Sequence, residues 1–251
     1  MDILETDAYD RRHRRNVSCA LFFSLVPFFL STAAYFYLWT PDSPPSIMSA
    51  GVKSAPVLLL AAAVLGWNGG QSILGVVGGL IFSAVGDGCL IWPELFLYGM
   101  GAFAVAHLLY SISFLSSRYA SYSSSGSSSW IRLLYLIVLI AGVGFYIFLY
   151  PFLLKLPNSD MLVPAVGIYV ALISLMGALA IRTQHMPTLL GSLIFMVSDL
   201  SLALQVFKVM ENMQHGNIIV MVTYYLAQLL IAVGDMKAVE DKDDFSKWKR
   251  S

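Results

Sequence analysis

The sequence predicts an all-α membrane protein, a polytopic bundle of eight transmembrane helices. Of its 251 residues, 58% are hydrophobic and only 12% are charged, and the mean hydropathy is +0.73. This composition lies far outside that of soluble domains. Apolar segments close to the roughly 20 residues that a helix needs to cross a bilayer recur along the chain. The charged residues gather toward the two ends, which argues against a nucleic-acid-binding surface.

Eight apolar segments approach the length of a transmembrane helix. The second and third have the weakest hydropathy because they contain several glycines. Small residues at four-residue spacing, Gly75, Gly79 and Ser83, favour a third helix packed closely against its neighbours. The predicted helices cover residues 17–39, 50–67, 72–92, 95–115, 130–150, 161–182, 187–208 and 217–235.

The distribution of Lys and Arg predicts the orientation. With the N-terminus in the cytosol, the lumenal side keeps only Lys53, Lys155 and Lys208, and this bias follows the positive-inside rule. Eight spans then place both hydrophilic tails, residues 1–16 and 236–251, in the cytosol. The other twelve of the fifteen Lys and Arg fall on that side, namely Arg11, Arg12, Arg14, Arg15, Arg118, Arg132, Arg182, Lys237, Lys242, Lys247, Lys249 and Arg250.

Residues 116–129 contain nine serines and one glycine, a composition typical of a flexible linker. We interpret this segment as a cytosolic connection between two four-helix halves, 17–115 and 130–235, of one membrane domain that covers residues 17–235. Duplication of a four-helix unit would relate the halves by a pseudo-twofold axis along the membrane normal. The alternative is a chance match between similarly spaced apolar helices.

The C-terminus carries lysines at the third and fifth positions from its end, Lys247 and Lys249. This pattern is similar to a dilysine retrieval signal and predicts an endoplasmic-reticulum location. The alternative is a basic tail held near the membrane by anionic lipids.

Two acids lie inside predicted spans, and seven mostly apolar residues separate each of them from a preceding glycine. These stretches are Gly79 to Asp87 and Gly191 to Asp199, each in the third helix of its half. An ionisable group within a span costs a few kcal/mol on insertion scales and marks a functional site by default. We therefore expect Asp87 and Asp199 to form one catalytic centre. The acids at span ends, by contrast, are expected only to be solvated: Glu94, Asp160 and Asp235.

Polar side chains accompany the acids on the last helix of each half. His107 and Tyr110 are three residues apart and share a helix face. Tyr224, Tyr225 and Gln228 form a similar stripe in the last span. They are candidates for substrate binding or a proton network. The alternatives are hydrogen bonding between helices for His107 and Gln228, and packing for the tyrosines.

Lys53 opens the second predicted helix and has two interpretations. Its side chain could reach to the membrane interface, or its ammonium could bind a lipid phosphate as a point charge. One membrane histidine and two acids are a sparse ligand set for a metal, so we expect no metal and no cofactor.

Several motifs together resemble the YhhN-like transmembrane family, whose animal members include lysoplasmalogenase. They occur in the family's order, and the resemblance covers about residues 20–235. The second predicted helix has a Lys-Pro element with two intervening residues. The motifs are Lys53 to Pro56; Phe82 to Trp92 followed by Gly101, Phe103, His107 and Tyr110; Ser198-Asp199; and Tyr224 to Gln228.

The resemblance implies hydrolysis of the vinyl ether bond of lysoplasmalogens to a fatty aldehyde and glycerophosphoethanolamine or glycerophosphocholine. Vinyl ethers are cleaved by protonation of the alkene carbon, which gives an oxocarbenium ion that water captures. Glycosidases handle such cations with one protonated and one ionised carboxyl group, a state that two acids sharing a low-dielectric cavity would adopt.

We therefore expect one of Asp87 and Asp199 to be the acid and the other to stabilise the cation and orient water. His107, Tyr110 and Gln228 would complete the proton network, and Lys53 would be the phosphate partner. The expected partners are the lysophospholipid substrate and membrane lipid, and the sequence is compatible with a homodimer. Two other functions remain open: a carrier for lipid or small solutes with acids near the midplane, and a family member that has lost catalysis and serves in interactions.

Overall fold

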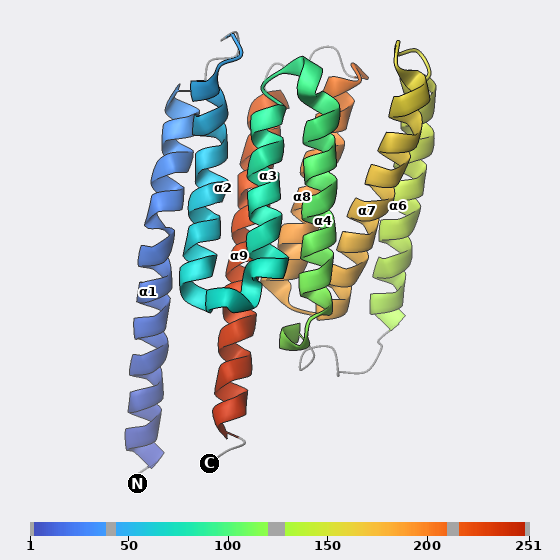
Figure 1. Ribbon diagram of the computed structural model, residues 1–251. Helices are drawn as coiled ribbons and strands as arrows, with labels where there is room; N and C mark the ends of the chain where they lie inside the picture. Colours follow the sequence, from blue (N-terminus) through green and yellow to red (C-terminus); the bar gives the residue numbers. More distant parts are fainter. Residues whose placement is uncertain (1–2, 39–43, 120–128, 210–215, 249–251) are drawn as a thin grey trace.

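The computed structural model describes residues 3–38, 44–119, 129–209 and 216–248, and these residues form helices and no strands, as predicted. Figure 1 shows the helices running side by side in a bundle. The α-helices are α1 (Ile3–Leu38), α2 (Ile47–Asn68), α3 (Gly78–Cys89), α4 (Phe96–Leu115), α6 (Ser129–Leu153), α7 (Ser159–Thr183), α8 (Met186–Val206) and α9 (Gly216–Trp248).

Seven stretches of the described chain are helical, long and apolar enough to cross a membrane. One of them, Ile47–Cys89, contains two of the eight predicted spans. The chain turns back within this stretch, so that α2 and α3 pack side by side (Figure 1). The prediction of a polytopic helix bundle is confirmed. The number of stretches is seven rather than eight because the second and third predicted spans lie in one unbroken helical stretch.

The reversal between α2 and α3 takes up more residues than predicted. Gly69 has a φ of 58°, a conformation that glycine adopts without steric cost. A short 3-10 turn and a π turn follow, in which Leu74 and Gly75 depart from helical angles. The regular helix α3 therefore begins at Gly78 rather than at residue 72. The glycines that weaken the hydropathy of this region are the residues that let it turn.

A buried charge cluster holds this reversal in place. Arg118 lies just after α4, and its Nη1 donates to the Oδ1 atom of Asp235 at 2.6 Å and to the hydroxyl of Ser72 at 2.9 Å. Its Nη2 donates to the backbone carbonyl of Gln71 at 2.5 Å. Asn68 and Ser72 donate to the other carboxylate oxygen of Asp235. Irregular backbone at membrane depth persists only where its polar groups have protein partners, and Arg118 supplies one.

The prediction that Asp235 is merely solvated is therefore wrong, because its side chain is fully buried. Glu94 and Asp160 are exposed, as predicted. Arg118 belongs to the serine-rich segment whose composition predicts a flexible linker, but it lies in a short 3-10 turn and is itself buried. Residues 120–128 of that segment lie outside the described residues.

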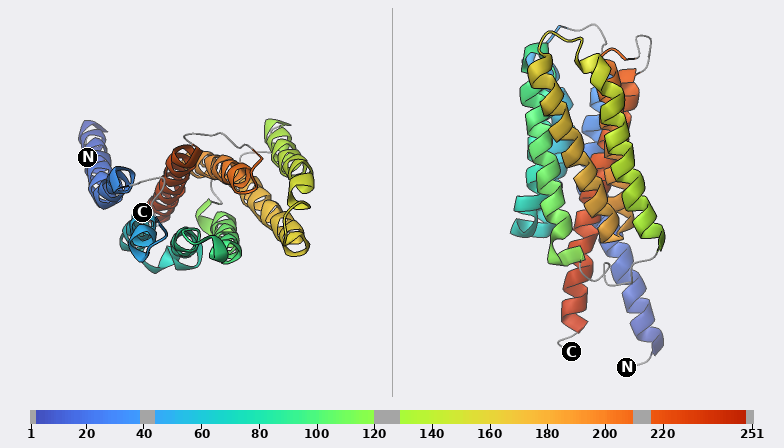
Figure 2. Two further views of the ribbon diagram at one scale, coloured as in Figure 1. Left: turned by 90° about the horizontal axis from the view of Figure 1, so that it is seen from above. Right: turned by 90° about the vertical axis from the view of Figure 1, so that its right-hand side faces the viewer.

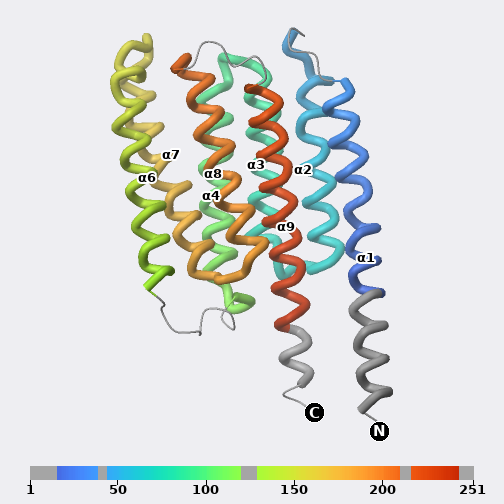
Figure 3. Tube along the Cα trace, turned by 180° about the vertical axis from the view of Figure 1, so that it is seen from behind, coloured from blue at the N-terminus to red at the C-terminus, as the bar shows by residue number. Residues whose placement is uncertain are grey.

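The helices contact each other in the same way in both halves. Consecutive helices pack within α1–α4 and again within α6–α9. Across the halves, α4 packs on α7 and α9 packs on α2, so that the last helix of each half meets the second helix of the other. Seen from above, α1 and α6 lie at opposite edges of the bundle (Figure 2). This reciprocal pairing supports the duplication, which stays a prediction. Figure 1 shows that α1 begins and α9 ends at the same end of the bundle, and Figure 3 shows the coloured parts of both helices running toward that end.

The glycine of each Gly-to-Asp stretch is a helix contact. A Cβ atom at Gly79 would overlap the ring of Tyr110 on α4. One at Gly191 would lie 2.9 Å from the backbone nitrogen of Ile231 and 3.0 Å from the carbonyl oxygen of Ala227, both on α9. Such close approach through small residues is the usual way in which membrane helices pack. Each glycine thus brings its acid-bearing helix against the last helix of its own half.

Replacing Gly191 with alanine should destabilise the protein by about 1–3 kcal/mol, because the new methyl group meets rigid α9 backbone and forces the helices apart. Thermal unfolding in detergent, followed by loss of helical circular dichroism, measures this. Gly101→Ala is the matched control, because nothing lies within 4 Å of a Cβ at Gly101. Equal melting temperatures for the two variants would contradict this account of the α8–α9 contact.

Candidate active site

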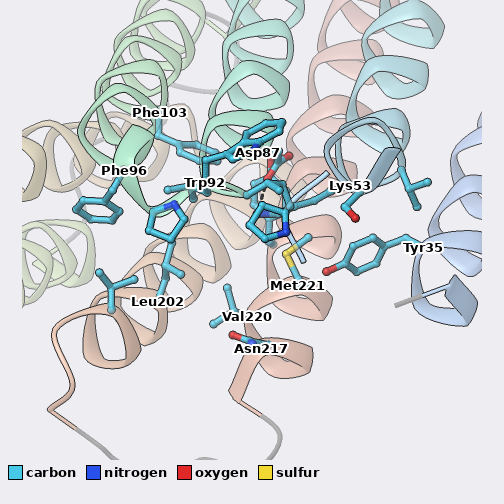
Figure 4. A pocket seen from close by; sticks show the side chains of 18 of the residues that line it. Tyr35, Lys53, Asp87, Trp92, Phe96, Phe103, Leu202, Asn217, Val220 and Met221 are labelled. Carbon is cyan, nitrogen blue, oxygen red and sulfur yellow. Dashed lines mark hydrogen bonds and ion pairs between the residues drawn. The ribbon is translucent and has the colours of Figure 1, made fainter. Parts of the chain in front are cut away.

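A single cavity of about 830 Å³ contains both predicted acids, Asp87 and Asp199, in its lining. Residues from α1, α2, α3, α4, α7, α8 and α9 line it, together with residues 44–46, 90–93, 156 and 207 of the connections. Asp87 stands near the end of α3 and Asp199 in the second half of α8. The cavity therefore lies toward the end of the bundle opposite to the start of α1 (Figures 1 and 4).

Asp87 is buried and has partners on two other helices. The hydroxyl of Tyr224, on α9, donates to its Oδ2 atom at 2.6 Å. The Nζ atom of Lys53, on α2, lies 3.8 Å from its Oδ1 atom. Lys53 also lines the cavity and points toward Asp87 (Figure 4). The interpretation of Lys53 as a side chain reaching out to the membrane interface is therefore wrong, because its ammonium pairs with an acid inside the bundle.

Asp199 has a different set of partners. The hydroxyl of Tyr169, on α7, donates to its Oδ2 atom at 2.5 Å. The same oxygen lies 3.1 Å from Nε2 of His107, on α4, and this nitrogen lies 3.0 Å from the Tyr169 hydroxyl. The other ring nitrogen of His107 faces the sulfur of Met176 at 3.3 Å. Asp199, His107 and Tyr169 thus form a closed triangle of hydrogen-bonding groups.

The two acids occupy equivalent places in the two halves. Asp87 is held by the second helix of its own half, through Lys53, and by the last helix of the other half, through Tyr224. Asp199 is likewise held by the second helix of its own half, through Tyr169, and by the last helix of the other, through His107. The positions match, but the chemistry differs: an ammonium and a phenol at one acid, an imidazole and a phenol at the other.

The other predicted network members do not contact the acids directly. Tyr110 donates to the Oε1 atom of Gln228 at 2.6 Å, and its hydroxyl lies 3.5 Å from that of Ser83. Tyr225 donates to the backbone carbonyl of Lys53 at 2.7 Å. None of Tyr110, Tyr225 and Gln228 lines the cavity. Of the predicted network members, His107 and Tyr224 bond to the acids directly.

Sequence reasoning missed Tyr169, which bonds to both Asp199 and His107. The available signal was a tyrosine in the middle of an apolar span, on the same helix of its half as Lys53. It also missed the aromatic lining of the cavity, which includes Trp92, Phe96 and Phe207. Aromatic residues are common in membrane helices, so their number alone does not single these out.

The arrangement suits an amphipathic ligand and proton-transfer chemistry. Apolar side chains form much of the lining, and a few polar groups converge inside it, as in typical small-molecule sites. Both carboxyl groups line this one cavity. Within the described residues, no group of three or more His, Cys, Asp or Glu side chains could hold a metal. The two carboxyl groups, each with different hydrogen-bonding partners, are the candidates for this chemistry.

The fold and the cavity define a polytopic membrane protein with two acids in one lipid-sized site. The chain belongs to the YhhN family, whose model matches residues 48–234. It is 35% identical to the protein named lysoplasmalogenase TMEM86A of Bos taurus, over 88% of this chain and 92% of that relative. It is 38% identical to lysoplasmalogenase TMEM86B of Sus scrofa, over 83% and 84% of the two chains. A lysoplasmalogenase of Mycobacterium bovis is 28% identical over 61% and 58%. No solved structure matches the chain.

Proposed function

We propose that this protein is a lysoplasmalogenase, an ether hydrolase that cleaves the vinyl ether bond of lysoplasmalogens. The products are a fatty aldehyde and glycerophosphoethanolamine or glycerophosphocholine. The observation that carries the proposal is one cavity of about 830 Å³ lined by both Asp87 and Asp199. Relatives that bear the name lysoplasmalogenase and align over most of the chain support it.

The reaction requires a proton donor and a group that stabilises a cation. A proton is added to the alkene carbon farther from the ether oxygen, and this leaves an oxocarbenium ion at the carbon that bears the oxygen. Water adds to that carbon and loses a proton, which gives a hemiacetal. The hemiacetal then collapses to the aldehyde, and the glycerol oxygen leaves with a proton. The proton that the donor gives up is replaced by the one that water loses, so one water molecule is consumed and the site is restored.

The partners of the two acids support an assignment of these roles. The Lys53 ammonium beside Asp87 stabilises an ionised carboxylate, which suits stabilisation of the oxocarbenium ion and orientation of water. Asp199 shares its Oδ2 atom between Tyr169 and His107, so this cluster can hold a proton and pass it on. We assign Asp199, supported by His107 and Tyr169, as the proton donor, and Asp87 as the carboxylate. Such a donor contributes about 10²- to 10⁴-fold to a rate.

Replacing Asp87 or Asp199 with asparagine should each lower aldehyde release from a lysoplasmalogen by at least about 100-fold. The assay uses detergent-purified protein and follows the aldehyde. Asp160→Asn, which removes an exposed acid at the start of α7, should keep the wild-type rate. A wild-type rate in either site variant would exclude the paired-acid mechanism. If the wild-type protein released no aldehyde but carried out proton-dependent lipid flux, the protein would be a carrier.

Replacing Tyr169 with phenylalanine should lower the rate by about 10-fold, because Asp199 loses a hydrogen bond in a buried site. Tyr146→Phe is the matched control. It removes a hydroxyl that donates to the Val163 carbonyl between the neighbouring helices α6 and α7. The two variants should melt at similar temperatures and differ in activity. Equal activities would remove Tyr169 from the proton-donating cluster.

Lys53 is also the proposed partner of the lipid phosphate, since its ammonium faces the cavity. Lys53→Ala should weaken binding of a saturated ether lysophospholipid, which cannot be hydrolysed, by about 10-fold. Lys155→Ala is the control, because Lys155 is exposed outside the cavity. Unchanged affinity in Lys53→Ala would leave Lys53 only as the ion-pair partner of Asp87.

We further propose that the protein lies in the endoplasmic-reticulum membrane with both termini in the cytosol. The start of α1 and the end of α9 share one end of the bundle (Figure 1), and twelve of the fifteen Lys and Arg belong to that side in the predicted topology. Terminal tags that were reachable only from the lumen would overturn this topology. A homodimer stays a prediction, for which crosslinking in native membranes is the test.

A further inference from the structure

A second, smaller pocket of about 60 Å³ lies beside Asp199, between α4, α6, α7 and α8. Apart from Asp199 and Tyr169, its lining is apolar. It shares Asp199 and the aromatic residues Phe96, Phe103 and Phe207 with the main cavity. We call this pocket the side slot. It extends the main cavity toward α6, a helix that does not line the main cavity.

The groups around the two acids differ along the length of the combined cavity. Lys53 lies beside Asp87 on one side, together with Tyr35, whereas Phe96 and Leu202 lie on the other (Figure 4). The side slot continues from the apolar side, past Asp199. A ligand with a charged head and a hydrocarbon tail would therefore lie with its head near Lys53 and its tail toward the slot.

We propose that the side slot binds the first carbons of the alkenyl chain and so orients the vinyl ether between the two acids. This inference rests on the proposed function. With the chain in the slot, the alkene carbon that receives the proton lies on the side of Asp199. The ether oxygen and the carbon that becomes positive lie on the side of Asp87. The slot thus places each reacting atom beside the acid whose partners suit it.

The size of the slot limits what it holds. A water-sized group needs about 10–15 Å³ of cavity volume. A slot of about 60 Å³ therefore holds on the order of four to six chain carbons. The slot therefore recognises the carbons next to the vinyl ether rather than the whole tail. A substrate whose alkenyl group has only three carbons has almost nothing to place there.

The test narrows the slot and compares two chain lengths. Ala203, on α8, lines the slot but not the main cavity. Ala203→Leu should lower kcat/KM for a lysoplasmalogen with a sixteen-carbon chain by about 10-fold, because about two methylene groups lose their burial. With a three-carbon alkenyl analogue the change should stay below about 2-fold. Ala171→Leu makes the same substitution on the exposed face of α7 and should leave both values unchanged.

The pattern across substrates separates the slot from other causes. If Ala203→Leu disturbed folding, or if Ala203 acted in catalysis alone, kcat/KM would fall equally for both substrates. An equal fall, or no fall for either substrate, overturns the proposal. Binding of a saturated ether lysophospholipid gives a readout that needs no hydrolysis. Ala203→Leu should weaken binding of the sixteen-carbon ether about 10-fold. If the wild type hydrolyses no lysoplasmalogen but Ala203→Leu still weakens binding of the ether lipid, the proposed function is wrong and the slot is still a chain-binding site. If Ala203→Leu leaves this binding unchanged, the slot does not bind the chain.

Discussion

The structure depends on one constraint: a carboxyl group buried within a membrane bundle needs a partner on another helix. Three acids satisfy this constraint, each with a different basic partner. Asp87 faces the Lys53 ammonium, Asp199 faces the His107 ring, and Asp235 binds the Arg118 guanidinium. Each pair joins segments that are distant in the sequence, so the three contacts together specify how the helices are placed. The first two acids line the cavity, and the third secures the reversal between α2 and α3 at the other end.

Much of the fold could be predicted from the sequence because its determinants are local. The length of an apolar segment indicates a span, and the cost of an acid within a span marks Asp87 and Asp199 as special. The outcome for Asp235 shows where such reasoning ends. It stands near the end of a span, where water is a plausible partner, and only the folded chain brings Arg118 to it. The start of α3 differs from its predicted position for a related reason, since Gly69 and Gly75 permit a turn but do not require one.

The candidate site shows the same division between local and tertiary information. The sequence could single out the acids and His107 as candidates, but it could not say which partner belongs to which acid. Tyr169 looks like any aromatic residue of an apolar helix until α7 is placed against α8. Conversely, Tyr110 and Gln228 have the spacing of site residues but bond to each other. Spacing along one helix defines a face, whereas the neighbour of that face is set by the packing of the whole bundle.

The exchange of partners between the halves has an evolutionary consequence. His107 belongs to the first half and serves the acid of the second, while Tyr224 belongs to the second half and serves the acid of the first. If the two halves arose by duplication, a four-helix ancestor could not have completed its acid within one chain and would have needed a second, identical subunit. Fusion of two copies would then have freed the two acids to acquire different partners. An ammonium beside one acid and an imidazole beside the other is a difference that a symmetric ancestor could not have had.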